Sequence, residues 1–85
     1  MTQKFPLVRL VDDDELFRTS QALMLQMNGF AIATYASAKE FLERDDPDRP
    51  GCVILDVRMP TMTGLELQEV MQQRGWRIPL LFLTG

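Results

Sequence analysis

Four short apolar runs limit the folds open to this 85-residue chain more than any other feature of its sequence. The runs are rich in aliphatic or β-branched residues, and three of them stop at a polar residue, as buried strands often do. The four predicted strands are Leu7–Val11, Phe30–Tyr35, Cys52–Leu55 and Leu80–Leu83. Because a strand must pack its apolar side chains against another element, the segments between the runs must supply the rest of the core.

The first of these segments carries the signals of an amphipathic helix. We expect it to be capped by Asp13 or Asp14 and to end near Met27, because Asn28-Gly29 is a typical helix-terminating pair. Apolar residues at helical spacing form a broad stripe along it. The stripe comprises Leu16, Phe17, Leu23, Met24, Leu25 and Met27.

Two further helices follow. A capping box of Ser37 and Glu40 begins a short helix that ends near Arg44. The third helix is predicted from about Gly64 to Gln73, and the residues expected to face inward are Leu65, Val70 and Met71. Strand and helix therefore alternate, which predicts one small α/β domain with a parallel sheet and helices on both faces.

Composition narrows the possible chemistry. The chain has no His and one Cys, which excludes His general bases, Cys–His nucleophiles and the usual zinc sites. Nine basic and twelve acidic residues give a net charge of −3, which argues against direct contact with nucleic acid or an anionic membrane. No run approaches the roughly 20 apolar residues of a membrane span, and the N-terminus lacks a signal sequence. We therefore expect a cytoplasmic protein.

Acidic residues follow two of the predicted strands. Asp12 and Asp13 come directly after the first strand, and Asp56 comes directly after the third. Ligands of open parallel sheets bind outside the carboxyl ends of the strands, so these side chains should converge if the two strands are neighbours. Converging carboxylates repel one another unless a cation lies between them, and Mg²⁺ prefers such oxygen ligands. The site could then support phosphoryl transfer to an aspartate, with the Thr84 hydroxyl donating to a phosphoryl oxygen.

Each of these residues also has a structural interpretation. Asp13 or Asp14 could serve only as a helix cap, and acidic runs are often simply solvated. Asp56 is harder to explain in this way, because a carboxylate that directly follows four apolar strand residues needs polar partners. The combination of the three acids with strand–helix alternation favours a functional site.

Three segments resemble the receiver domain of bacterial response regulators: Val11–Glu15, Ile54–Gly64 and Pro79–Gly85. The Asp-x-x-Met-Pro-x-x-x-Gly pattern that begins at Asp56 is highly specific. The Val-Arg-Met-Pro and Leu-Thr-Gly segments are most similar to those of the FixJ-like branch of the family. Full-length members of that branch carry a C-terminal helix-turn-helix and regulate transcription. The resemblance implies a flavodoxin-like (CheY-like) doubly wound parallel sheet with strand order 2-1-3-4 for the four strands present.

The resemblance also implies a role for individual residues. Asp56 corresponds to the phosphoacceptor, which receives its phosphoryl group from a sensor histidine kinase. Asp12, Asp13, Asp56 and the backbone carbonyl of Arg58 correspond to the magnesium ligands. Thr84 corresponds to the hydroxyl residue that contacts the phosphoryl group and transmits the switch. A protein of this kind is a signalling module and not an enzyme.

The sequence departs from the family pattern at its C-terminal end. A complete receiver continues with a helix, a fifth strand that carries an invariant lysine, and a last helix. Residues 1–85 are therefore expected to be the N-terminal two-thirds of a receiver. The only lysines, Lys4 and Lys39, are not placed to replace the missing one. An open edge on the fourth strand and an uncovered sheet face predict a homo-oligomer.

Two alternatives stay open. Leu10–Asp14 also fits the apolar strand and Asp-x-Asp motif of haloacid-dehalogenase-type phosphohydrolases, with Asp12 as the nucleophile. The short length and the Met59-Pro60 segment, which such a hydrolase does not need, argue against it. The other alternative is a dimerisation fragment that binds Mg²⁺ without switching.

Overall fold

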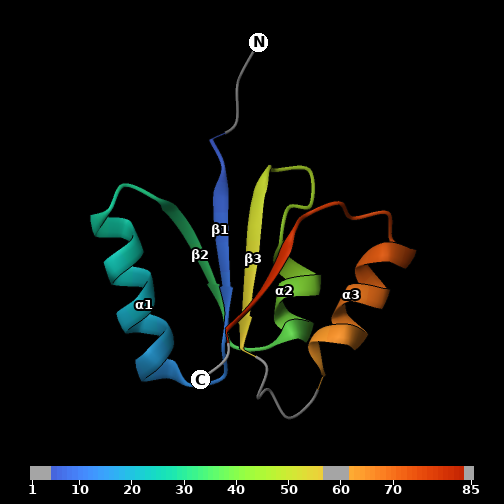
Figure 1. Cartoon of the computed structure of the whole chain (residues 1–85), viewed down its shortest axis with the longest axis horizontal. Coiled ribbons are helices and arrows are strands. Elements are labelled where there is room, and N and C mark those ends of the chain that lie inside the picture. Colours follow the sequence, from blue (N-terminus) through green and yellow to red (C-terminus); the bar gives the residue numbers. More distant parts are fainter. Residues whose placement is uncertain (1–4, 57–61, 84–85) are drawn as a thin grey trace.

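In the computed structural model, which describes residues 5–56 and 62–83, a parallel four-stranded sheet carries helices on both faces (Figure 1). The strands are β1 (Leu7–Val11), β2 (Ala31–Tyr35), β3 (Gly51–Asp56) and β4 (Leu80–Leu83). Their order in the sheet is β2-β1-β3-β4, and all three neighbouring pairs are parallel. The predicted fold class and strand order are confirmed.

Three helices connect the strands: α1 (Glu15–Met27), α2 (Ala38–Arg44) and α3 (Gly64–Gln73). Asp14, rather than Asp13, caps α1, and its side chain accepts a hydrogen bond from the Phe17 N–H at 3.1 Å. The caps of α2 and α3 are Ser37 and Thr63. No helix in the described part of the chain is both long and apolar enough to cross a membrane.

The larger core lies between the sheet and the helices α2 and α3. Strand alternation directs Val11, Val53 and Leu55 to this face, where α2 contributes Phe41. The helix α3 contributes Leu67 and Met71, which lie four residues apart and so on one side of the helix. The prediction that Leu65 faces inward is wrong: its position on α3 lies off this side, and 70% of its surface is exposed.

A buried ion pair joins β1 to the loop that follows α2. The Arg9 Nε and the Asp45 carboxylate approach to 2.9 Å with both side chains fully buried. The Tyr35 hydroxyl donates to the same carboxylate at 2.9 Å, and the Arg9 guanidinium also donates to the carbonyls of Asp46 and Arg49. Burial, and next the hydrogen bond to Asp45, raise the pKa of Tyr35 to about 12. These contacts hold the loop that leads into β3.

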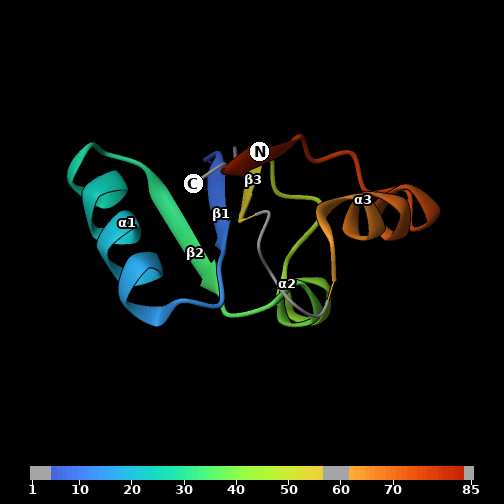
Figure 2. The same cartoon turned by 60° about the horizontal axis from the view of Figure 1, so that its bottom comes forward.

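The helix α1 packs alone on the other face of the sheet, opposite α2 and α3 (Figure 2). Only Ala22 of α1 is buried, and Leu25 is half-buried. Most of the predicted apolar stripe on α1 is exposed to solvent instead. This face of the molecule therefore carries far less packing than the face that α2 and α3 cover.

Candidate functional site

Three acidic side chains meet at the carboxyl edge of the sheet. The strands β1 and β3 are parallel neighbours, with Val11 opposite Leu55, so the residues after Val11 lie beside the end of β3 (Figure 1). Asp12 and Asp13 follow β1, and Asp56 is the last residue of β3. Carboxylate oxygens of all three lie within 4.8 Å of one another. The structure thus brings together the three carboxylates that the strand ends predict.

The turn between β1 and α1 fixes the orientation of Asp12. The Asp14 N–H donates to Asp12 Oδ1 at 2.9 Å, and the Arg18 guanidinium donates to the Asp12 backbone carbonyl at 2.6 Å. Asp12 is fully buried, whereas Asp56 is half-buried and Asp13 is exposed. The three acids therefore form a site that is closed at Asp12 and open to solvent at Asp13.

The electrostatics of Asp12 are unfavourable without a cation. Burial raises the pKa of this carboxyl group, and the hydrogen bond from the Asp14 N–H opposes the rise. The negative charges of Asp56, Asp13 and Asp14 raise it further. Its second oxygen, Oδ2, is buried and lacks a hydrogen-bond partner within the described residues. A buried carboxylate that has one oxygen without a donor, and that lies close to other carboxylates, is the environment that a divalent cation relieves.

The donor set indicates which kind of cation would fit. All three groups offer carboxylate oxygens, which are the ligands of hard ions such as Mg²⁺ and Ca²⁺ rather than of soft transition metals. Few protein carboxylates and an open side that water can reach suit Mg²⁺. The residues present therefore fit the predicted ion.

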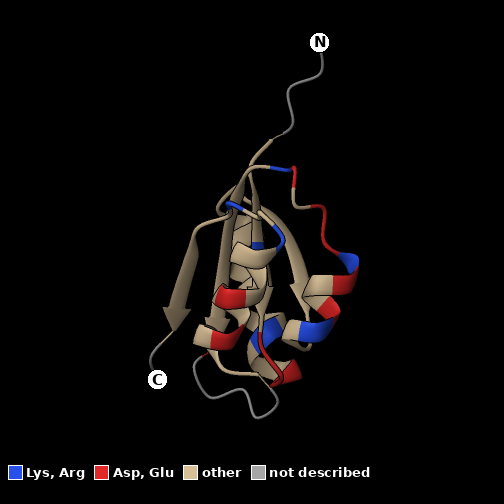
Figure 3. Ribbon diagram, turned by 90° about the vertical axis from the view of Figure 1, so that its right-hand side faces the viewer, with Lys and Arg blue, Asp and Glu red and all other residues tan. Residues whose placement is uncertain are grey.

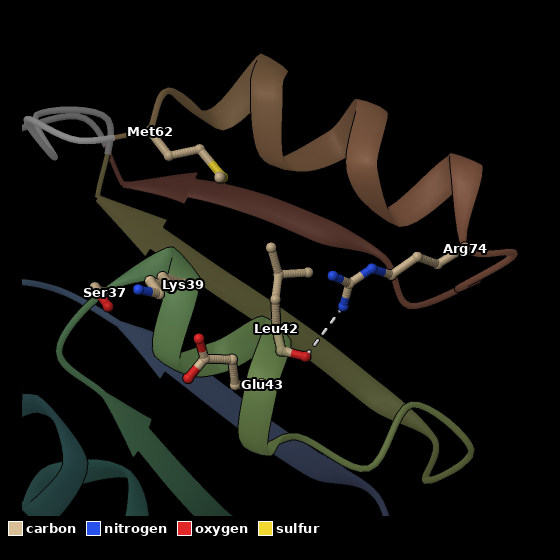
Figure 4. A pocket seen from close by; sticks show the side chains of 6 residues that line it. All are labelled: Ser37, Lys39, Leu42, Glu43, Met62 and Arg74. Atoms are coloured by element: carbon tan, nitrogen blue, oxygen red, sulfur yellow. Dashed lines mark hydrogen bonds between the residues drawn. The ribbon is translucent and has the colours of Figure 1, made fainter.

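Two other predicted site residues, Thr84 and Arg58, lie outside the described residues. Lys39 is exposed on α2 and lines a separate pocket of about 420 Å³ between α2 and α3 (Figure 4). The pocket is lined by Ser37, Lys39, Leu42, Glu43, Met62 and Arg74. None of the three clustered carboxylates borders it.

Two contacts of the site were not predicted from the sequence. One is the hydrogen bond from the Asp14 amide to Asp12, and the other is the contact of Arg18 with the Asp12 carbonyl. The first has a signal, because a carboxylate two residues before a helix cap can accept from the cap's amide. Arg18 lies one turn into the predicted helix, and nothing in the local pattern indicates which way its side chain turns.

Fold and site together define a doubly wound α/β domain with an acidic ligand site at the carboxyl ends of its central strands. Comparison with known proteins then gives the family. The response regulator receiver domain matches residues 8–85, and this chain belongs to that family. This membership replaces the alternative assignment to the haloacid-dehalogenase-type hydrolases.

Individual relatives agree with the family. The chain is 40% identical over 78 residues to the transcriptional regulatory protein TdiR of Thauera aromatica, covering 92% of this chain and 34% of the relative. It is 38% identical over its whole length to the transcriptional regulatory protein FixJ of Azorhizobium caulinodans, covering 40% of that protein. The chain thus spans less than half of either relative.

Solved structures give the same result. The crystal structure of FixJ-N is 40% identical and superposes with a TM-score of 0.85, over 98% of this chain and 66% of that one. The response regulator StyR is 41% identical with a TM-score of 0.87, over 94% of this chain and 40% of that one. The chain is therefore similar in both sequence and fold to receiver domains of known structure.

Proposed function

We propose that this chain is the phosphoaccepting part of a response regulator and that Asp56 accepts the phosphoryl group from a sensor histidine kinase. The observation that carries the proposal is the cluster of three carboxylates within 4.8 Å, one of which has a buried oxygen without a hydrogen-bond partner. Family membership supports the same reading.

Burial favours Asp56 over Asp12 as the nucleophile. Asp12 is fully buried and one of its oxygens already accepts from a backbone amide, so it is less accessible to an incoming phosphorus atom than Asp56 is. Asp56 is half-buried at the end of a central strand, which holds it in place while leaving it accessible. Asp13 is exposed on the turn before α1, where less of the structure fixes its side chain.

In the proposed reaction, one carboxylate oxygen of Asp56 attacks the phosphorus of the phosphorylated kinase histidine. An O–P bond forms on Asp56, and the P–N bond to the imidazole breaks. The electron pair of that bond stays on the histidine nitrogen, so no oxidant or further reactant is needed. The product is an aspartyl phosphate.

Asp12, Asp13 and Asp56 would hold Mg²⁺, and the backbone carbonyl of Arg58 is the further ligand that we propose from the resemblance. When bound, the ion supplies positive charge that offsets both the carboxylates and the phosphoryl oxygens. Asp12 then anchors the site from its buried side, because its main chain is tied to Arg18 and Asp14. We assign the Thr84 hydroxyl as the donor to a phosphoryl oxygen and as the residue that transmits the switch.

The similarity to known relatives supports a proposal for the cellular role of this chain. TdiR and FixJ are transcriptional regulatory proteins, and we propose that this chain serves the same kind of protein in the cytoplasm as the N-terminal two-thirds of its receiver. As an isolated chain, it is proposed to self-associate through the edge of β4 and the sheet face beside α1. Within the described residues, β4 pairs with one strand only, which is β3.

The test is to map the phosphoryl group. The chain is incubated with acetyl phosphate and Mg²⁺, the acyl phosphate is trapped by borohydride reduction, and the modified peptide is identified by mass spectrometry. We expect modification at Asp56, none in the presence of EDTA and none in the Asp56→Asn variant. Asp48→Asn, a change at an exposed acid of the loop after α2, is the matched control and should stay modified. Modification at Asp12 or Asp13, or modification that does not need Mg²⁺, would overturn the proposal.

If Mg²⁺ binds but Asp56 is never modified, the alternative of a fragment that binds the ion without switching is supported instead. Circular dichroism of each variant shows whether a loss of modification reflects a loss of fold. A folded Asp56→Asn variant that is still modified at another residue would count against Asp56 as the acceptor.

A further inference from the structure

A long segment of the chain carries no charge. From residue 19 to residue 38 there is no Lys, Arg, Asp or Glu, although charged residues make up 25% of the whole sequence. The segment includes most of α1, the turn after it and all of β2. The opposite side of the molecule differs, because charged residues lie along α2, α3 and the loop after α2 (Figure 3). The C-terminal part of α1 and the whole of β2 thus carry no charge.

A regular apolar row runs along α1, and all of it except Leu16 lies in the uncharged segment. Leu16, Ser20, Leu23 and Met27 are spaced four, three and four residues apart, which places them on one side of the helix at the a and d positions of a heptad pattern. We call these four residues the α1 row. Its three apolar members are 79%, 58% and 77% exposed. The row points away from the sheet, because Ala22 and Leu25 are the residues of α1 that pack inward.

We propose that two copies of this chain pair through the α1 row, with the two α1 helices packed antiparallel. A chain with a net charge of −3 repels its own copies, and the repulsion is weakest where neither surface carries a charge. An apolar row with heptad spacing is complementary to itself.

The acidic end of α1 selects the antiparallel arrangement. Asp13, Asp14 and Glu15 lie at the N-terminal end of the helix, and all three are exposed. Parallel helices would bring these six carboxylates of the two copies together, whereas antiparallel helices keep them at opposite ends. Antiparallel pairing also places Ser20 of one copy near Leu23 of the other.

The available surface sets the strength of the pairing. Besides the row, Phe17, Met24 and Phe30 are also exposed. With about 200 Å² for a fully exposed large apolar side chain, the six apolar residues present roughly 700 Å² per copy. Complete burial of this area in both copies would reach the lower end of the range for specific interfaces, and a real interface buries less. The dimer is therefore expected to be weak and to form at micromolar concentrations or above.

Asp13 affects only the orientation of the two helices, and the paired surface includes none of the three carboxylates and no residue of β4. The pairing therefore does not depend on the proposed phosphorylation or on association through the sheet edge. Sedimentation equilibrium over a concentration series from micromolar to hundreds of micromolar measures it directly. We expect a monomer–dimer equilibrium for the unmodified chain. Leu23→Glu should weaken it at least about tenfold, because the variant buries a charge at the centre of the interface.

Two further variants make the test specific. Leu65→Glu introduces the same change at an exposed leucine of α3 and should leave the dimer unchanged. Ser20→Leu completes the apolar row and should strengthen the dimer several-fold without forming species larger than a dimer, which distinguishes this gain from aggregation of misfolded chain. A monomer at every concentration would overturn the proposal. So would a dimer that Leu81→Glu on β4 weakens while Leu23→Glu and Ser20→Leu do not alter it.

Discussion

Replacing Asp12 by Asn removes one negative charge from the carboxylate cluster and changes little else. The Asn side-chain oxygen can still accept the hydrogen bond from the Asp14 N–H. Its amide group takes the position of the oxygen that now has no hydrogen-bond partner, and it can donate toward the neighbouring carboxylates. We therefore expect Asp12→Asn to stabilise the chain when no divalent ion is present.

The size of the effect follows from the distance between the carboxylates. Two unit charges 4.8 Å apart, the limit within which these oxygens lie, repel by about 0.9 kcal/mol in water and by about 3.5 kcal/mol at an effective dielectric constant of about 20. Because Asp13 is exposed and Asp56 is half-buried, the true value lies between these limits. We expect the free energy of unfolding in EDTA to rise by about 1–3 kcal/mol in the variant.

The same cluster predicts the response to Mg²⁺. An ion that binds only the folded chain stabilises it by about 1.4 kcal/mol at ten times its dissociation constant. The wild-type chain should show this gain, and Asp12→Asn should lose most of it. Stabilisation by removal of the charge and by addition of the ion should therefore not be additive.

Urea unfolding followed by the fluorescence of Trp76 measures both effects. Trp76 is the single tryptophan and packs edge-on against the ring of Phe41 in the larger core, with 5.7 Å between ring centroids. Asp48→Asn is the matched control, because it removes an exposed acid outside the cluster. The reasoning is refuted if Asp12→Asn destabilises the chain in EDTA, or if Mg²⁺ stabilises the variant as much as the wild type.

The remaining predictions concern pH, the buried ion pair and one glycine. Because the pKa of Tyr35 is raised from 10 to about 12, its contribution to the free energy of unfolding should be fully present below pH 10 and should be lost as the pH rises towards 12. Tyr35→Phe should remove this dependence in urea titrations. Arg9→Met should cost about 3–5 kcal/mol, because it leaves the buried Asp45 carboxylate without its cation, and much of that loss should return in the double variant with Asp45→Asn. Gly51→Ala should lower the unfolding midpoint much more than Gly75→Ala. Both glycines have positive φ, but only at Gly51 would the added Cβ overlap the backbone of β1.

Much of the fold could be predicted because its signals are local. The strand Leu7–Val11 matches the predicted run, α2 begins directly after the predicted cap Ser37, and α3 spans the predicted range Gly64–Gln73. The convergence of Asp12 with Asp56 needed one further rule, that parallel strands carry their ligands at one edge. The rule brings Asp12 and Asp56 together only if β1 and β3 are neighbours, and the structure shows that they are.

The features that sequence reasoning missed depend on the packing of distant segments. Arg9 interrupts an apolar strand, and its partner Asp45 lies 36 residues away in a loop that resembled ordinary solvated turn sequence. The inward side of α3 was also misjudged, because Leu65 and Leu67 are equally apolar and only the docking of the helix decides which of them is buried. Neither outcome has a local signal.

The central claim is that Asp12, Asp13 and Asp56 bind one divalent ion together. Anomalous diffraction from crystals of the chain soaked in Mn²⁺, a hard ion that accepts the same oxygen ligands, tests it most directly. The account predicts an anomalous peak within coordination distance of all three carboxylates. The claim would be contradicted by an ion that binds elsewhere on the protein while none binds at the three carboxylates. It would also be contradicted by an Asp56 carboxylate that is turned away from the bound ion.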